Sequence, residues 1–504
     1  MGDEGSSVRM AERLLKFVSI DAQMPNKREV AKRTGDFHEI YAEFITQKAN
    51  EQASRCSQCG VPFCQTGCPL QNNIPDWLKM TAEGRLEEAY ALSSATNSMP
   101  EICGRICPQD RLCEGACVIE QSGHGAVTIG AVERYITETA WDQGWITPIT
   151  PPRELAEHVG IVGAGPAGLA AAEALRNKGY QVTIYDRYDR AGGLLIYGIP
   201  SFKLEKVVVS RRIEHLKASG VTFVQNYEVG RNGTLADLRA AHDCVLIAIG
   251  VYKARPLPCP GSDGEGVVEA LDYLTASNKT GLGDYIPAFE SGALNAQGKR
   301  VVVIGGGDTA MDCVRTAIRQ GAAKVTCLYR RDRANMPGSA REVSNAQDEG
   351  VVFEWLAAPK AVHATSKGVT GVLATRMRLG EADSTGRQAS EELVGGEFDV
   401  PADLVIKALG YDPEPVQTLF DEPALKVSRW GTIRADAITG ETSVQNVFAA
   451  GDIVRGASLV VWAIKDGREA AEHMHQAMRK QARQLGEAAQ YAAQRDVTLK
   501  PASF

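Results

Sequence analysis

Eight of the twelve cysteines in this 504-residue chain lie in two groups between residues 56 and 117. In chain order they are Cys56, Cys59, Cys64 and Cys68, and then Cys103, Cys107, Cys113 and Cys117. Proline follows Cys68 and Cys107, as it often follows the last cysteine of an iron–sulfur run, and eight thiolates suit two four-iron clusters. A zinc ribbon, which needs four ligands, and disulfides or unligated cysteines are the alternatives. The pattern predicts two [4Fe–4S] clusters.

A glycine-rich turn follows an apolar run near residue 160. The order strand, turn, helix and strand is read from HVGIVGAGPAGLAAAEALRNKGYQVTIYD. The residues assigned to the turn are Gly163, Gly165, Pro166, Ala167 and Gly168. Glycines here allow a tight turn and the close approach of a pyrophosphate to the helix N-terminus. Asp186 ends the second strand, where a carboxylate binds ribose hydroxyls and repels a 2′-phosphate, so this unit predicts FAD or NAD.

A second copy of this unit begins with KRVVVIGGGDTAMDCV. Its turn residues are Gly305, Gly307, Asp308, Thr309 and Ala310, and alanine in the last place is an accepted variant. Here the second strand ends in Arg330 and Arg331 instead of an acid. Guanidinium groups form bidentate hydrogen bonds with phosphate, so the position favours NADP(H) over NAD. The alternative is a solvated run of charge.

Three other stretches carry residues suited to a flavin. Gly193 and Leu194 follow a close-approach turn, and Gly250 ends the apolar run DCVLIAIG. Gly451 and Asp452 separate an apolar run from a helical one, where a Gly-Asp pair can bond the ribityl chain of a flavin. We therefore predict FAD at the first unit.

These units predict an α/β chain with two Rossmann-like dinucleotide-binding domains, one inserted in the other, after an α-helical iron–sulfur domain. The expected domains are residues 1–150 for the clusters, 151–253 and 412–504 for FAD, and 254–411 for NADPH. Apolar spacing predicts helices within residues 11–25 and 28–44. Residues 351–400 are expected to form short strands and polar turns.

Charge and hydropathy exclude two classes of partner. The net charge of −7 gives no electrostatic reason to expect nucleic acid. No apolar run approaches the length of about 18 residues that a membrane helix needs. The first residues, MGDEGSSVRM, lack an apolar leader, so we expect a cytoplasmic protein.

The chain resembles the family of small (β) subunits of bacterial NADPH-dependent glutamate synthase. The resemblance rests on NEQASRCSQCGVPFCQ, NNIPDWLK, ICGRICPQDRLCEG, VIGGGDTAMDCVRTAIRQGA, YRRDR, NMPGS and FAAGDIVRGASLVVWAI. It implies FAD, NADPH, two [4Fe–4S] clusters and a large (α) subunit that makes L-glutamate from L-glutamine and 2-oxoglutarate. Cofactors carry this chemistry, so no catalytic side chain is predicted. The alternatives are an NADPH-dependent electron donor to ferredoxin or another reductase partner, and a scaffold that has lost its flavin.

The N-terminal half of dihydropyrimidine dehydrogenase has the same architecture, and this resemblance implies how the ligands divide. One cluster would have Cys56, Cys59, Cys64 and Cys117. The other would have Cys68, Cys107 and Cys113. By position its fourth ligand would be Glu133, where that relative has glutamine, and Cys103 is the rival. The carboxylate would favour the oxidised cluster by its negative charge.

Overall fold

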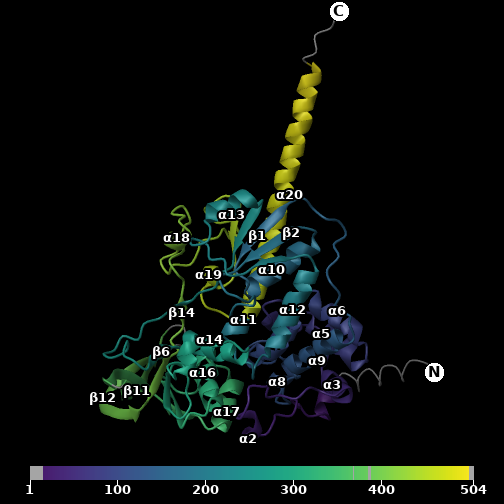
Figure 1. The fold of residues 1–504 in the computed structure, drawn as a ribbon. Coiled ribbons are helices and arrows are strands. Elements are labelled where there is room, and N and C mark those ends of the chain that lie inside the picture. Colours follow the sequence, from purple (N-terminus) through teal and green to yellow (C-terminus); the bar gives the residue numbers. More distant parts are fainter. Residues whose placement is uncertain (1–14, 367, 384–387, 499–504) are drawn as a thin grey trace, which may run out of the picture. The chain divides into compact units, whose positions relative to one another are not determined.

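The computed structural model describes residues 15–366, 368–383 and 388–498, and the chain divides into two compact units. The first unit contains residues 1–147, 192–212 and 252–412, and the second contains residues 148–191, 213–251 and 413–504. Each unit has a five-stranded sheet, and the first also holds the N-terminal helices (Figure 1). The predicted fold class, two Rossmann-like folds after a helical segment, is confirmed. The three predicted domain boundaries stay predictions.

The second unit is built on a parallel sheet with the strand order β15-β4-β1-β2-β3. Its strands are β1 (His158–Val162), β2 (Gln181–Tyr185), β3 (Thr222–Val224), β4 (Cys244–Ile247) and β15 (Val447–Ala449). Its helices are α10 (Pro166–Asn177), α13 (Leu235–Ala241), α18 (Val416–Leu419), α19 (Asp452–Arg455) and α20 (Val460–Thr498). Strand β4 is buried along its whole length, because a central parallel strand is covered on both faces.

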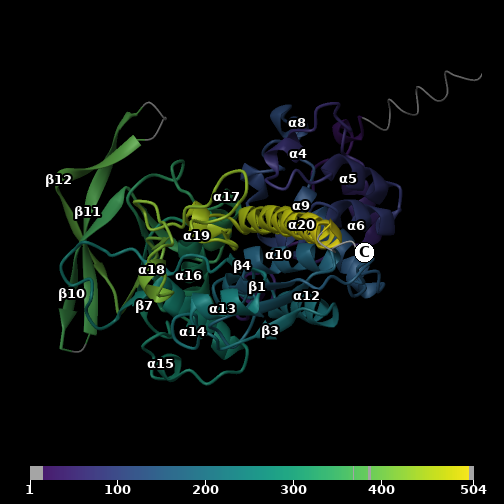
Figure 2. The same ribbon diagram turned by 90° about the horizontal axis from the view of Figure 1, so that it is seen from above.

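Helices α10 and α20 pack against each other beside this sheet (Figure 2). They meet through backbone, since a Cβ on Gly467 would lie 2.1 Å from the carbonyl oxygen of Ala167. Any side chain at position 467 would therefore push α20 away from the start of α10.

The first unit has its own parallel sheet, in the order β6-β13-β7-β8-β9. The strands are β6 (Val267–Glu269), β7 (Arg300–Ile304), β8 (Lys324–Tyr329), β9 (Val352–Trp355) and β13 (Leu404–Lys407). The associated helices are α14 (Ala270–Gly281), α15 (Pro287–Glu290), α16 (Asp308–Arg319) and α17 (Ala340–Asp348). Tyr273 of α14 and Met311 of α16 belong to one buried core with these strands.

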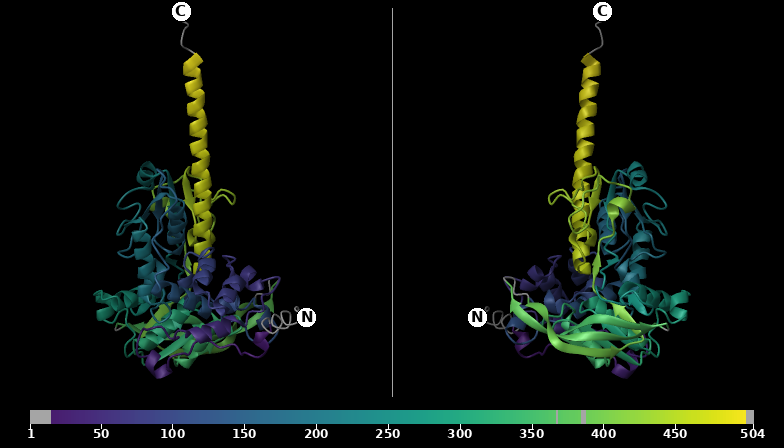
Figure 3. Two further views of the ribbon diagram at one scale, coloured as in Figure 1. Left: turned by 90° about the vertical axis from the view of Figure 1, so that its right-hand side faces the viewer. Right: turned by 90° about the vertical axis from the view of Figure 1, so that its left-hand side faces the viewer.

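A three-stranded antiparallel sheet is attached to the first unit (Figure 3). Its strands are β10 (Ala357–Thr365), β11 (Gly368–Ala382) and β12 (Gln388–Pro401), and a short pair is formed by β5 (Lys253–Ala254) and β14 (Tyr411–Asp412). Strands β11 and β12 have 15 and 14 residues, so the prediction of short strands for residues 351–400 is wrong in length. Polar residues are used here for pairing across strands, as in the ion pairs of Lys360 with Glu392 and Glu397.

The N-terminal part of the first unit is helical. Its elements are η1 (Lys16–Val18), α2 (Val30–Arg33), α3 (Thr46–Ala53), α4 (Phe63–Gly67), α5 (Ile74–Ala82), α6 (Leu86–Ser94), α7 (Pro100–Ile106), η2 (Gln109–Arg111), α8 (Val118–Gln121) and α9 (Ile129–Asp142). Further along the chain are α11 (Leu194–Tyr197) and α12 (Lys206–Ala218), which crosses from the first unit into the second. Trp77 is fully buried among α3, α5 and α9, and its indole nitrogen donates to Asn72 Oδ1 at 3.0 Å.

The two helices predicted within residues 11–25 and 28–44 are wrong for the described part of the chain. Only η1 and the single turn α2 form there, and residues 11–14 lie outside the described residues. Tertiary contacts replace helical ones, because Arg33 at the end of α2 is buried and pairs with Glu349 at 3.1 Å. Apolar spacing cannot reveal such a partner more than 300 residues away.

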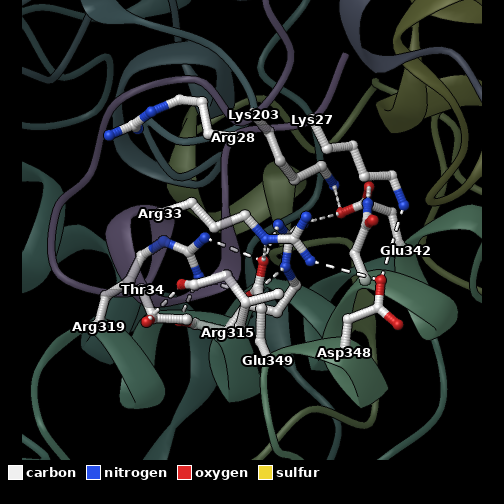
Figure 4. A network of polar contacts seen from close by, with 12 residues as sticks. Lys27, Arg28, Arg33, Thr34, Lys203, Arg315, Arg319, Glu342, Asp348 and Glu349 are labelled. Atoms are coloured by element: carbon white, nitrogen blue, oxygen red, sulfur yellow. Dashed lines mark hydrogen bonds and ion pairs between the residues drawn. The ribbon is translucent and has the colours of Figure 1, made fainter. Parts of the chain in front are cut away.

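Glu349 is the centre of a buried network of charges in the first unit (Figure 4). Its carboxylate accepts two hydrogen bonds from Arg315, at 2.8 and 2.9 Å, and two from Arg319, at 2.8 and 3.1 Å. Burial alone would raise the pKa of Glu349, but the hydrogen bonds from both arginines outweigh burial and lower it. The network joins α2 to the helices that flank the second glycine turn.

Glu349→Ala is expected to destabilise the protein by about 3–5 kcal/mol, because it breaks a buried ion-pair network and leaves the buried Arg319 without a carboxylate. Arg319 would lose the only carboxylate that it contacts among the described residues. Denaturant unfolding followed by circular dichroism measures the effect. Glu29→Ala is the control, since Glu29 pairs with Lys32 on the surface and should cost less than about 1 kcal/mol. Equal losses for the two variants would contradict the prediction.

Candidate functional site

The first glycine turn lies between β1 and α10 in the second unit. Gly163 has φ +108°, and a Cβ there would lie 2.4 Å from the carbonyl oxygen of Ala248. A Cβ on Gly168 would lie 2.0 Å from the carbonyl oxygen of Gly163, so the helix packs directly on the turn. At Gly165, in contrast, no described atom lies within 4 Å of a Cβ. The open space in front of a helix N-terminus fits the pyrophosphate of a dinucleotide.

Several predicted flavin residues surround this turn within the second unit. Asp186 Oδ2 accepts a hydrogen bond from the backbone N–H of Ala164 at 2.6 Å, so its carboxylate braces the turn itself. Gly451 has φ +77°, and a Cβ there would lie 3.0 Å from the Cβ of Ala167 at the start of α10. Burial raises the pKa of the adjacent Asp452 to about 6. The sheet thus brings Asp186 and the Gly-Asp pair to one turn, and their contacts with a flavin stay a prediction.

Gly250, Gly193 and Leu194 are the other residues predicted to bind a flavin. Gly250 follows β4 with φ +70°, two residues beyond Ala248, which borders the first glycine turn. Gly193 has φ +53° and caps α11, which begins at Leu194. Gly193 and Leu194 belong to the first unit, so the predicted flavin residues are divided between the two units.

The second glycine turn repeats the geometry of the first, between β7 and α16. Gly305 has φ +148°, and a Cβ there would lie 2.2 Å from the carbonyl oxygen of Ala408. Gly307 has φ −85° and ψ 179°, close to the −79° and −176° of Gly165, and no described atom lies within 4 Å of its Cβ position. Helix α16 starts at Asp308, followed by Thr309 and the buried Ala310. This turn therefore fits a second dinucleotide.

Arginine at the end of β8 distinguishes the two turns. Arg330 is exposed and Arg331 is half-buried, directly after Tyr329, the last residue of the strand. Neither forms an ion pair with a residue in the described part of the chain. Both guanidinium groups therefore have their charge available for a phosphate, whereas the first turn has the Asp186 carboxylate at the equivalent place.

One pocket of the helical part is lined by four cysteines of the predicted first set. They are Cys56, Cys59, Cys64 and Cys117. Apolar side chains including Leu78 and Ile129 complete the lining. Burial raises the pKa of Cys64 to about 12, and the neighbouring cysteines add to the shift. Such a thiol becomes a thiolate only beside a strong positive charge, which iron supplies.

The remaining cysteines gather with Glu133 in a second set. A hydrogen bond with Cys103 and then burial raise the pKa of Cys107, with further contributions from Glu133 and Cys113. The pKa of Cys68 is raised to about 11 by burial and by the proximity of Cys103 and Glu133. Both candidates for the fourth ligand, Cys103 and Glu133, thus lie close enough to Cys68 and Cys107 to raise the pKa values of these thiols.

Glu133 is held by groups that sequence analysis did not identify. Its Oε1 accepts hydrogen bonds from Asn97 at 3.3 Å, Asn72 at 3.4 Å and Ser93 at 3.5 Å. Burial raises the pKa of Glu133 to about 8 in spite of these bonds. These neutral donors carry no spacing signal, because they come from two segments of the chain that lie far from Glu133 in the sequence.

No group of three or more His, Cys, Asp or Glu side chains in the described ranges is arranged around a single metal ion. The arrangement needed for a four-iron cluster is wider, because each protein ligand binds a different iron of the cluster.

Two family models match the chain. Residues 33–145 match dihydropyrimidine dehydrogenase domain II, 4Fe-4S cluster. Residues 157–477 match the pyridine nucleotide-disulphide oxidoreductase family. In the described residues no helix has the length and apolar character needed to cross a membrane.

Curated relatives match over most of their length. The glutamate synthase [NADPH] small chain of Azospirillum brasilense is 65% identical over 464 residues, covering 92% of this chain and 96% of the relative. The putative oxidoreductase AegA of Escherichia coli is 46% identical over 454 residues, covering 89% of this chain and 68% of the relative. The solved structure of Mycobacterium tuberculosis FprA in complex with NADPH is similar with a TM-score of 0.54 at 21% identity, covering 68% of this chain and 86% of FprA. This last likeness concerns the fold alone.

Proposed function

This chain belongs to the family of NADPH-dependent glutamate synthase small chains, and from that premise we propose that it is the electron-input subunit of such an enzyme. It takes electrons from NADPH and delivers them to a large subunit that makes L-glutamate from L-glutamine and 2-oxoglutarate. The observation that carries the proposal is the combination, in one chain, of two glycine turns with opposite charge at the strand end and two cysteine sets.

The charge beside each glycine turn determines which cofactor it binds. The first turn, with Gly163, Gly165 and Asp186, holds FAD, because its carboxylate opposes a 2′-phosphate. The second turn, with Gly307 and Arg330, holds NADPH, because its arginines attract that phosphate. FAD bound at the first turn would supply acceptance of a hydride from NADPH and transfer of single electrons to iron–sulfur clusters. The protein supplies binding and orientation, and no side chain is needed as an acid or base.

The cysteine sets hold two [4Fe–4S] clusters. The first has Cys56, Cys59, Cys64 and Cys117 as ligands, and all four line one pocket. The second has Cys68, Cys107 and Cys113, with Glu133 or Cys103 as the fourth ligand. The corresponding domains are residues 1–150 for the clusters, 151–253 and 412–504 for FAD, and 254–411 for NADPH.

Purification with and without the large subunit tests the proposal. We expect the chain alone to contain FAD and about eight irons, two clusters of four, and to reduce an artificial dye with NADPH. Addition of the large subunit should give NADPH-dependent glutamate formation from glutamine and 2-oxoglutarate. A flavin-free, folded chain would contradict the proposal.

A second candidate is an electron donor to another reductase partner, and the 46% identity to the putative oxidoreductase AegA favours it. The same experiment separates the two functions. Under the second candidate the chain reduces dye with NADPH but does not support glutamate formation, and it co-purifies with a different redox protein.

Replacing Arg330 and Arg331 by glutamine is expected to weaken the binding of NADPH far more than the binding of NADH. Each lost charge-assisted hydrogen bond to the 2′-phosphate should cost about 1.5–3 kcal/mol, and NADH has no such phosphate. Steady-state dye reduction with both nicotinamides gives the two values of kcat/KM. The control is Arg429→Gln, which removes an arginine of the second unit that lies over the Trp430 ring. Equal weakening of NADPH and NADH would show that the two arginines do not bind the phosphate.

A further inference from the structure

Two stretches of the chain have no role in the proposed electron path, and the first unit joins them. One is the loop Pro108–Leu112 between Cys107 and Cys113 of the second set, and the other is the segment Asn335–Ser339. Arg111 donates hydrogen bonds to three successive carbonyl oxygens of that segment. The acceptors are Met336 at 2.9 Å, Gly338 at 2.7 Å and Pro337.

Neighbours of Arg111 extend this connection on both sides. Asp110 accepts hydrogen bonds at 3.3 Å from the Ser339 hydroxyl and from the backbone N–H of Ala340, the first residue of α17. Arg341 donates from the other direction, to Gln109 Oε1 at 3.0 Å. It also pairs with the buried carboxylate of Glu114 at 2.9 Å. The two stretches are therefore held by charged and neutral hydrogen bonds together.

The same segment also holds the second glycine turn. The backbone N–H of Gly338 donates to the carbonyl oxygen of Gly306 at 2.9 Å. The N–H of Ser339 donates to Asp308 Oδ1 at 3.0 Å. Movement of the segment would therefore displace the turn that faces the dinucleotide.

On the cysteine side the connection is stiff. The carbonyl oxygen of Gln109 accepts from the N–H groups of Leu112, Glu114 and Gly115, at 2.9–3.1 Å. Its side-chain amide donates to the carbonyl oxygen of Cys103 at 3.2 Å. The loop is thus fixed to the residues that carry the second cysteine set.

A pocket lies between the two stretches, within the first unit. Its lining includes Cys107 and Gln109 from the cysteine loop, and Asp308, Ser339 and Arg341 from the nucleotide side. A dinucleotide bound at the second turn would therefore border the same pocket as the second cysteine set.

We propose that Arg111 is a positioning residue that fixes the Met336–Ser339 segment on the second glycine turn and thereby couples nucleotide binding to the second iron–sulfur cluster. The inference rests on the proposed function, since it requires NADP(H) at the turn and a cluster on the cysteines. Such coupling is reciprocal, so nucleotide binding must perturb the cluster as the cluster loop supports nucleotide binding.

Arg111→Ala in the full-length holoprotein tests the proposal, with Arg111→Lys as the conservative variant. The matched control is Arg85→Ala, an exposed arginine of the helical part that pairs only with Glu83 and Glu88 among the described residues. The dissociation constant of NADP⁺ should rise about tenfold in Arg111→Ala, because the segment that holds the turn loses its three hydrogen bonds from Arg111. Arg111→Lys should recover part of the affinity, and Arg85→Ala should match the unchanged protein. Iron and FAD contents should stay constant in all of them.

The second readout is spectroscopic. With excess dithionite keeping the clusters reduced, addition of NADP⁺ should change the line shape of their electron paramagnetic resonance spectrum at a constant number of spins. The change should persist in Arg85→Ala and vanish in Arg111→Ala. A merely structural role for Arg111 would leave this nucleotide-dependent change in place.

If Arg111→Ala keeps normal NADP⁺ affinity and the spectral change, the coupling inference is overturned. The proposed function is not affected by that result. Failure of the unsubstituted protein to bind NADP⁺ would overturn the proposed function as well. If Arg111→Ala does not fold, Asp110→Ala removes the bonds to Ser339 and Ala340 and should give the same two losses. Wild-type behaviour of Asp110→Ala would then count against the coupling.

Discussion

Gly165→Val is expected to yield a folded protein that purifies without most of its FAD. Gly165 has φ −79° and ψ −176°, an extended conformation that valine adopts readily. No described atom beyond the neighbouring residues lies within 4 Å of the added Cβ, so the variant leaves room for the branch point of valine. The new side chain enters the space in front of α10, where we place the pyrophosphate. The free energy of unfolding without cofactor should therefore change little.

The expected loss of FAD affinity is about tenfold to a hundredfold, since steric overlap of this kind costs about 1–3 kcal/mol. Flavin released by heat and quantified by chromatography gives the occupancy. Gly307→Val is the matched control, because the same change at the second turn has the same backbone conformation and the same open space. It should keep FAD and lose affinity for NADPH. Full FAD occupancy in folded Gly165→Val, or loss of FAD in both variants, would contradict the assignment of cofactors to turns.

The glycine turns could be predicted from the sequence because their causes are local. The glycines, the apolar strand before them and the residue at the end of the next strand all lie within about 30 residues, the size of one βαβ unit. Asp186 and Arg330 accordingly lie at the strand ends where they were expected. The bond from Ala164 to the Asp186 carboxylate was not predicted, because it depends on the geometry of the finished turn.

Other features depend on contacts between distant segments and have no local signal. Apolar spacing predicts that Arg33 lies within a helix of residues 28–44. In the structure its buried ion pair with Glu349 takes the place of further helical turns. Arg111 contacts residues more than 200 positions away, and nothing in PQDRLCEG indicates that partner. The division of the cysteines came from resemblance, and the pocket shared by Cys56 and Cys117 agrees with it although about 60 residues separate them. Spacing along the chain alone could not have joined the first and last cysteine of the segment.

Cys59→Ser is expected to abolish electron delivery to the large subunit while the reduction of flavin by NADPH continues. A serine hydroxyl is a poor substitute for a thiolate at iron, and the first pocket would keep only Cys56, Cys64 and Cys117. Hydride transfer depends on the two glycine turns, and the pocket that contains Cys59 is lined by no residue of the second turn, which lies in the same unit. Dye reduction with NADPH should therefore stay close to normal, whereas glutamate formation with the large subunit should fall to background. Iron content should fall by about four per chain, one cluster.

Cys259→Ser is the matched control, because Cys259 is a free, partly buried cysteine outside both sets and should leave iron and activity unchanged. Ligand binding by the cysteine segment contributes to its folding, so circular dichroism must show that Cys59→Ser keeps its helices. If Cys59→Ser loses its helices, Cys64→Ser removes a different cysteine from the same pocket. A folded variant that lacks this iron yet supports normal glutamate formation would show that the first cluster stabilises the helical part and carries no electrons. Loss of dye reduction in a folded variant with full FAD would instead place the first cysteine set on the path from flavin to dye.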